Sequence, residues 1–291
     1  MAVYTNQGMS IASGISGIEL GLSAIIPNYK TVIYIEREIN AVQILIKRME
    51  DGSIEHKAPI YSDIEEFDPE PFIGKIHTIT SGLPCQPFAY SGLRKQDKDP
   101  RYLFPAFRRI IEQVRSPVIF MEQVPGETFH YYAKVRPELS KLGYTFKEGL
   151  FSSYEIGAPQ IRQRFFVLGC TDRDFLPNNF NIPVPEKENS FIPNGHGIRT
   201  PPPNAGQNST EQIINSNHKK NRLQIFPPGP TESEEWSQMP TEMQASIPYI
   251  CRETSGVSAG MVGRISAIGN SVSPPVSALA FRTLSEQLKR T

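Results

Sequence analysis

A single cysteine stands on a short segment that two prolines stiffen. The segment is Ser81-Gly82-Leu83-Pro84-Cys85-Gln86-Pro87-Phe88, and it follows an apolar run over residues 76–80. That run predicts a buried strand that ends at Gly82. The two prolines stiffen the turn that follows the strand. Ligands and reactive groups gather at such strand ends in α/β sheets. Cys85 is therefore the first candidate for chemistry, as a nucleophile that reacts in its thiolate form.

The other cysteines give no second site. The chain holds three in all, Cys85, Cys170 and Cys251, far apart and odd in number. This pattern argues against a disulfide framework and against a zinc cluster, and we expect no metal. A lone cysteine is more often a small buried apolar residue, which is our interpretation of Cys170 and Cys251.

The first elements of the chain predict a place for a cofactor. A short strand over residues 9–12 runs into a turn over 13–17 and then an apolar helix over 18–26. A glycine turn between strand and helix lets backbone approach a nucleotide-like ligand, although two glycines alone are a weak signal. The next strand, 31–35, ends on Glu36, and an acid about 20 residues past such a turn suits a ribose diol. The alternative for Glu36 is an ordinary surface glutamate.

Strands and helices continue to alternate as far as residue 170. Apolar residues at helical spacing (Ile39, Val42, Ile46, Met49) predict one helix, and residues 103–114 another with Leu103, Phe107, Ile110, Ile111 and Val114 on one side. We also expect strands at 117–121 and 164–169 and helices at 137–142 and 276–288. The fold class is α/β, with a doubly wound, mostly parallel sheet.

Composition changes after Cys170. Residues 171–225 contain ten asparagines against three in residues 1–170, and prolines cluster there. Residues 171–257 carry seven Lys and Arg against ten Asp and Glu, so this part is not a basic module. We interpret it as a small, loop-rich lobe.

Whole-chain properties limit the class of protein. Hydrophobic residues make up 38% of the 291, enough for a core. No run approaches the about 18 apolar residues of a membrane helix, and the N-terminus lacks a signal pattern, so we expect a cytoplasmic protein without a membrane partner. Formal net charge is zero. Residues 85–115 hold seven Lys and Arg against three acids, which could meet phosphates, but charge alone favours a solvated helix face.

Four motifs in order make the chain resemble the cytosine-5 DNA methyltransferases. Gly82 to Phe88 is similar to their nucleophile loop, and Glu122-Gln123-Val124 to their Glu-Asn-Val signature. Gln160 to Arg164 fits Gln-x-Arg-x-Arg, and Gly269 to Pro274 fits their closing Gly-Asn-Ser/Ala-Val-x-Pro. The resemblance covers nearly the full length and implies a Rossmann-like catalytic domain (1–170 plus 258–291) with a target-recognition domain (171–257).

The resemblance implies covalent catalysis. Carbon 5 of cytosine is a weak nucleophile, and a thiolate that adds at carbon 6 turns the ring into an enamine. Cys85 would be that nucleophile, and Glu122, with a raised pKa, would donate a proton at ring nitrogen 3. Arg164 would contact the base oxygen, and Arg162 would help organise the nucleophile and the phosphates. The alternative for these charged residues is a structural ion-pair network.

The same resemblance implies the ligands. The methyl donor would be S-adenosylmethionine, and the substrate double-stranded DNA with its cytosine flipped out of the stack. The residues that would hold the cofactor are Ser13, Gly14, Ile15, Gly17, Glu36, Asp63, Ile64, Pro84, Asn270 and Ser271. Those that would contact DNA are Gln86, Ser91, Arg94, Gln160, Arg199 and Arg222. We expect a monomer, and whether a restriction endonuclease accompanies it is open.

Three departures from the family pattern leave alternatives. The family's motif over 12–17 is usually Phe-x-Gly-x-Gly-Gly, whereas this chain has Ala12 and Ser16. Gln123 stands in place of asparagine and keeps the amide. The altered turn leaves open a homologue that binds DNA without methylating it, and methylation of RNA is a third hypothesis.

Overall fold

The computed structural model describes residues 6–83, 103–158, 162–181, 267 and 269–291. A seven-stranded sheet forms its centre, in the order β3-β2-β1-β4-β5-β7-β6. The strands are β1 (Gln7–Ile11), β2 (Lys30–Ile35), β3 (Ile60–Tyr61), β4 (Thr78–Ser81), β5 (Val118–Gln123), β6 (Thr145–Ser152) and β7 (Gln163–Cys170). The helices are α1 (Gly17–Ile25), α2 (Ile39–Glu50), α3 (Phe104–Val114), α4 (Thr128–His130), a π-helix (Tyr131–Val135), α5 (Arg136–Lys141) and α10 (Pro274–Lys289).

Most of the sheet is parallel, as the alternating pattern predicts. β3, β2, β1, β4 and β5 pair in parallel, and β7 runs antiparallel between β5 and β6. The sequence analysis missed β6, because its residues Thr145 to Ser152 alternate poorly between apolar and polar. Its pairing with β7 supplies the order that its own pattern lacks.

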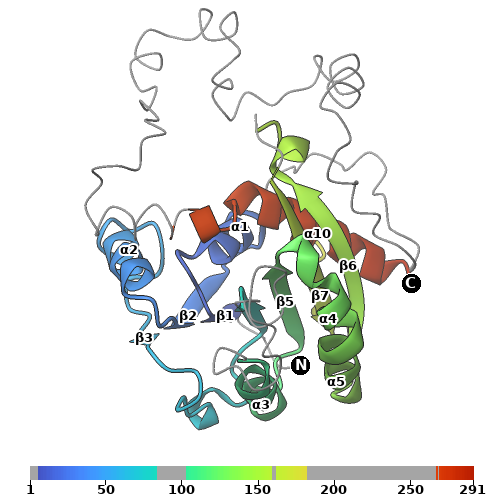
Figure 1. Ribbon diagram of the computed structural model, residues 1–291, viewed down its shortest axis with the longest axis horizontal. Helices are drawn as coiled ribbons and strands as arrows, with labels where there is room; N and C mark the ends of the chain where they lie inside the picture. Colours follow the sequence, from blue (N-terminus) through green and yellow to red (C-terminus); the bar gives the residue numbers. More distant parts are fainter. Residues whose placement is uncertain (1–5, 84–102, 159–161, 182–266, 268) are drawn as a thin grey trace, which may run out of the picture.

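Helices cover both faces of the sheet (Figure 1). Met9 and Ile11 of β1 point to one face, where they join a core with α3, the π-helix and α5. The residue between them, Ser10, points to the other face, which carries α1 and α10. This alternation is the two-residue period of a strand, and it makes the sheet doubly wound.

Two helices show where apolar spacing does and does not report burial. In α3, Phe107, Ile110, Ile111 and Val114 are buried, as predicted. In α2 the prediction of a helix is right, but Ile39 and Ile46 are 72% and 46% exposed. The buried residues of α2 are Ala41 and Leu45, and Leu45 packs with Tyr34 of β2. The apolar spacing therefore identified the helix but not its buried face.

The last helix lies beside the first in space. α10 opens at Pro274 and Pro275, where proline fits the first helical turn. It packs against α1 and the β6–β7 pair. In the described part of the chain, no helix is long and apolar enough to cross a membrane.

Candidate active site

The strand order reverses direction between β1 and β4. The chain moves outward from β1 through β2 to β3, then returns to place β4 on the other side of β1. Ligands bind at the carboxyl ends of strands at such a switch point. Here those ends lead into two segments, the turn from Ala12 to Gly17 and the loop that starts at Gly82.

Gly82 allows those two segments to approach each other. A Cβ on this residue would lie 3.2 Å from the carbonyl oxygen of Ala12 and 3.9 Å from Oε2 of Glu122. A side chain would crowd the carbonyl of Ala12 and make ordinary contact with Glu122. The nucleophile loop therefore leaves the sheet between the predicted cofactor turn and the predicted acid. Its residues Pro84, Cys85, Gln86, Ser91 and Arg94 lie outside the described residues, as do Gln160, Arg199, Arg222 and Cys251.

Glu122 lies at the end of β5 with an arginine against it. Its residue is 8% exposed, and Nε of Arg164 on β7 lies 2.8 Å from its Oε1, an ion pair without the alignment of a hydrogen bond. Burial raises the pKa of Glu122 to about 7, although Arg164 and then Arg162 pull it down. At neutral pH the carboxyl therefore exists in both acid and base forms and is able to donate a proton.

Arg162 makes a different kind of contact. Its guanidinium donates to the backbone carbonyl oxygens of Gly269 and Ser271, at 2.6 and 2.5 Å. These carbonyls belong to the closing motif, more than 100 residues away along the chain. Arg162 thus fastens that motif to the start of β7, a contact that the sequence analysis did not predict. The role expected for it, at the nucleophile and phosphates, stays a prediction.

The closing motif also rests on α1. A Cβ on Gly17 would lie 2.1 Å from the carbonyl oxygen of Val272, so only glycine fits there. One helical turn on, a Cβ on Gly21 would lie 2.0 Å from Oγ of Ser277, which donates to the carbonyl of Ile18. The closing motif therefore reaches the end of the glycine turn through Val272, while the contact of Asn270 and Ser271 with a cofactor stays a prediction.

The turn after β1 takes the left-handed backbone conformation three times. The φ angles are +51° at Ala12, +52° at Gly14 and +66° at Ser16. A residue other than glycine pays about 1–2 kcal/mol for this conformation. The amide of Ser13 donates to Ile35 at the end of β2, at 3.3 Å, and thereby fixes the start of the turn.

Glu36 meets this turn from the end of β2. Its two carboxylate oxygens accept from the amides of Gly14 and Glu38, at 2.6 and 2.7 Å. Burial raises the pKa of Glu36, and these amides lower it. Apart from its chain neighbours, no described residue would lie within 4 Å of a Cβ on Gly14, so the described part of the chain leaves space over the turn. A carboxylate next to an open glycine turn fits the diol of a ribose.

Asp63 and Ile64 follow the short strand β3 at the same edge of the sheet. The amide of Glu36 donates to the carbonyl of Tyr61 at 2.9 Å, which ties the ends of β2 and β3. Asp63 is half-buried and accepts from the amide of Glu65. Ile64 is only 6% exposed and packs in the core. The contact of both residues with an adenine ring stays a prediction.

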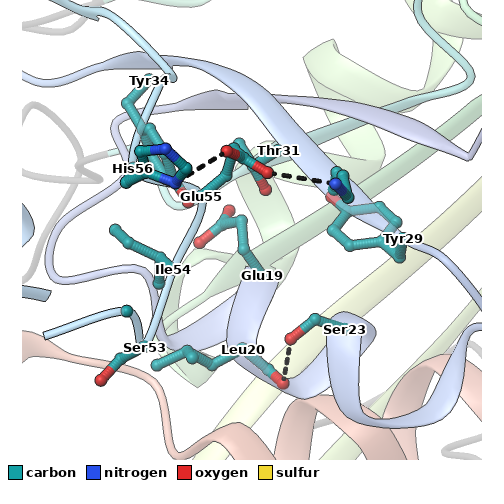
Figure 2. Close-up of a pocket in the computed structure, with 12 residues that line it drawn as sticks. Glu19, Leu20, Ser23, Tyr29, Thr31, Tyr34, Ser53, Ile54, Glu55 and His56 are labelled. Atoms are coloured by element: carbon teal, nitrogen blue, oxygen red, sulfur yellow. Dashed lines mark hydrogen bonds and ion pairs between the residues drawn. The ribbon is translucent and has the colours of Figure 1, made fainter. Parts of the chain in front are cut away.

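A buried acid that the sequence analysis did not single out lies beneath the turn. Oε1 of Glu19 accepts from Ser10 of β1 at 2.7 Å and from Thr80 of β4 at 2.6 Å. Burial raises the pKa of Glu19. A pocket of about 290 Å³ opens over it, between α1, β2 and residues 52–56 (Figure 2). The signal in the sequence was an acid next to Ile18 and three residues before Leu22, on the apolar face of a predicted helix.

Comparison with known proteins decides the family. The model of the C-5 cytosine-specific DNA methylase family matches residues 7–262. The chain belongs to this family. Its described residues contain no group of three or more His, Cys, Asp or Glu side chains placed to hold a metal.

Individual relatives of this methylase family are similar over different lengths. The Type II methyltransferase M.HhaI of Haemophilus parahaemolyticus is 31% identical over 119 residues, 39% of this chain and 36% of that protein. M.Eco47II of Escherichia coli is 23% identical over 277 residues, 91% of this chain and 61% of that protein. Among solved structures, Entamoeba histolytica EhMeth shares 21% identity over 61% of this chain and 63% of its own, with a TM-score of 0.49. The chain thus spans between about a third and three fifths of the two curated relatives.

Proposed function

We propose that this protein is a DNA cytosine-5 methyltransferase that acts through a covalent adduct of Cys85. The family match over residues 7–262 supports the reaction class. Within the site, the observation that carries the proposal is Glu122, a buried carboxyl with a pKa of about 7 beside the loop that leads to Cys85. The loop of the nucleophile therefore follows β4, and the proton donor lies at the end of the neighbouring strand β5.

The proposed mechanism assigns one task to each residue. The Cys85 thiolate adds to carbon 6 of the flipped-out cytosine, and Glu122 donates its proton at ring nitrogen 3, so that carbon 5 becomes nucleophilic. Arg164, 2.8 Å from Glu122, holds that carboxyl in place and contacts the base oxygen. After carbon 5 has gained the methyl group, it loses its proton to solvent, the bond between carbon 6 and Sγ of Cys85 breaks to release the thiolate, and Glu122 takes back the proton from ring nitrogen 3.

The cofactor in this proposal is S-adenosylmethionine, which supplies an electrophilic methyl group when bound. The described residues leave space over Gly14 for it, and Glu36, which accepts from the amide of Gly14, would also accept hydrogen bonds from its ribose hydroxyls. Ser13, Ile15, Gly17, Asp63 and Ile64 would line the same edge, with Pro84, Asn270 and Ser271 completing it. The donor set fits this group because it combines a carboxylate, free space over a glycine and the backbone of a strand-to-helix turn.

The domain division also belongs to the proposal. Residues 1–170 plus 258–291 would form the catalytic domain, and residues 171–257 the target-recognition domain. Packing of α10 on α1 and the Arg162 contacts to Gly269 and Ser271 support the assignment of the C-terminal part. We propose that Gln86, Ser91, Arg94, Gln160, Arg199 and Arg222 contact duplex DNA, and that a monomer acts in the cytoplasm.

Covalent trapping tests the proposed function. The full chain is incubated with S-adenosylmethionine and a pool of duplexes that carry 5-fluorocytosine in varied sequence contexts. We expect an adduct that survives denaturation, because fluorine at carbon 5 blocks release of the enzyme. Cys85→Ala should form none. Absence of any adduct on DNA that the protein methylates, or an equal adduct with Cys85→Ala, would reject the mechanism.

Two other outcomes identify the alternatives. The replacement of family residues by Ala12 and Ser16 favours, as a second candidate, a homologue that binds DNA without methylating it. Calorimetric titration with S-adenosylmethionine separates this candidate from an enzyme. Competition between duplex DNA and tRNA in a methyl-transfer assay decides whether RNA is the substrate.

A further inference from the structure

The most constrained residue of the glycine turn is Ser16. It has φ +66° and ψ +34°, it is fully buried, and it stands where the family pattern has glycine. Glycine adopts this conformation freely, whereas serine needs its surroundings to hold it there. The question is which contacts of this chain do so.

Local backbone bonds hold Ser16 only in part. Its amide donates to the carbonyl of Ser13 at 2.9 Å, and its carbonyl accepts from Leu20 at 3.1 Å as α1 begins. Its hydroxyl donates to Oη of Tyr34 at 3.4 Å. Tyr34 is 1% exposed on β2, and burial raises its pKa to about 12, so the phenol stays neutral and available as a partner.

Arg48 provides the contact that is most distant along the sequence. It lies in the last turn of α2, and its Nη1 donates to the carbonyl of Ile15, the residue before Ser16. That carbonyl lies before the first helical residue, Gly17, so α1 does not use it. Arg48 is half-buried, and this burial lowers the pKa of its guanidinium.

We propose that Arg48 and Tyr34 are positioning residues that hold the Ser16 turn in its cofactor-binding shape. Their contacts keep Ser16 in the left-handed conformation, which glycine, the residue of the family pattern, adopts without such contacts. This inference rests on the proposed function, because it takes the turn to be the seat of S-adenosylmethionine. It adds two residues, from α2 and β2, that the four family motifs do not contain.

The first test measures affinity of the full chain for S-adenosylmethionine by calorimetry. We expect Arg48→Gln to weaken binding about tenfold, because the substitution removes the charged donor from the buried carbonyl of Ile15. Tyr34→Phe should weaken binding about threefold, and Arg48→Lys should recover most of the loss. Lys47→Gln is the matched control, since its side chain is 74% exposed and pairs with Glu50 at the surface of the same helix.

Ser16→Gly separates positioning from general stability. In this background Arg48→Gln should cost no more than about twofold in affinity, since glycine keeps the left-handed turn without help. With saturating cofactor, Arg48→Gln should leave kcat near the wild-type value and raise KM for the cofactor. Thermal unfolding of each variant shows whether the fold is intact.

The outcomes distinguish this inference from the function on which it rests. Wild-type and Arg48→Gln proteins that bind the cofactor equally would reject the positioning role while leaving the methyl donor in place. A loss that Ser16→Gly fails to reduce would also reject it. A wild-type protein that does not bind S-adenosylmethionine would overturn the proposed cofactor and this inference together.

Discussion

The two sides of the switch point are held by different kinds of force. On the β1–β2 side, the turn from Ala12 to Gly17 is fixed by backbone hydrogen bonds, by Glu36 and by close approach of Val272. On the β4–β5 side, Glu122 is fixed by the charge of Arg164 at 2.8 Å. Hydrogen bonds and close packing hold the first side, and an ion pair holds the second.

This difference suggests a division of labour. The β1–β2 side, which hydrogen bonds and close packing fix, suits a ligand that must be bound the same way in every cycle. A side built on a carboxyl with a pKa near 7 suits a proton that moves during the reaction. Substitutions should therefore change affinity and stability on the β1–β2 side, and rate and pH dependence on the β4–β5 side.

The largest effect should come from Glu122→Gln. Glutamine has no acidic proton, so kcat for methyl transfer should fall about 10²–10⁴-fold. Affinity for S-adenosylmethionine should stay within about twofold, because Glu122 lies on the other side of the crevice. Single-turnover kinetics and calorimetry check the two statements. A variant that binds the cofactor poorly but reacts normally would break the proposed division.

Gly17→Ala should have the largest effect on the β1–β2 side. Its Cβ would lie 2.1 Å from a backbone oxygen of Val272, which must shift, and we expect a loss of about 3 kcal/mol in the free energy of unfolding. Gly14→Ala is the matched control, because its Cβ meets nothing within 4 Å and only the φ of +52° is strained. It should cost about 1 kcal/mol. Urea unfolding measures both free energies of unfolding. Equal losses in the two variants would show that Val272 does not pack against Gly17.

The contrast also explains what the sequence could predict. Strand ends are marked by local patterns, so the sequence predicts that Glu36, Gly82 and Glu122 each stand at or just after the end of a strand. Contacts between distant segments have no such pattern. Arg162 is part of a recognised motif, yet nothing near it in the chain indicates that it binds the carbonyls of Gly269 and Ser271.

Burial was the other quantity that the sequence predicted incompletely. Spacing alone marked Ile39 and Ile46 as apolar positions of a helix, but the sheet meets α2 at Ala41 and Leu45 instead. Glu19 is the reverse case, a charged residue type that lies buried because Ser10 and Thr80 bond to it. Both outcomes depend on where elements pack, which a single sequence does not specify.

A smaller effect, on pH dependence, should follow from Arg164→Met. In the proposed mechanism the acid form of Glu122 is the proton donor, so the wild-type rate should fall as pH rises through about 7. Arg164 lowers the pKa of Glu122, so its removal should move this fall to higher pH. The pH profile of the remaining single-turnover rate measures the shift, even though the variant is slower. Arg162→Met, which removes the weaker of the two influences, should move the profile less, and a shift to lower pH in either variant would contradict the assignment.

The smallest effect concerns Glu19, which bonds to both strands that feed the two sides. Because burial raises its pKa, the folded protein keeps a proton that the unfolded chain releases above about pH 4.5. Unfolding then releases a proton, so this residue makes stability fall as pH rises from about 4.5 toward the folded-state pKa. Glu19→Gln keeps an oxygen for Ser10 and Thr80 and removes the titration. Its free energy of unfolding, from urea titrations between pH 5 and 8, should therefore decline less with pH than that of the wild type, while Glu70→Gln at an exposed position should follow the wild type. If the Glu19→Gln and wild-type curves run parallel, Glu19 is charged in the folded protein, and Ser10 and Thr80 donate to a carboxylate rather than to a neutral acid.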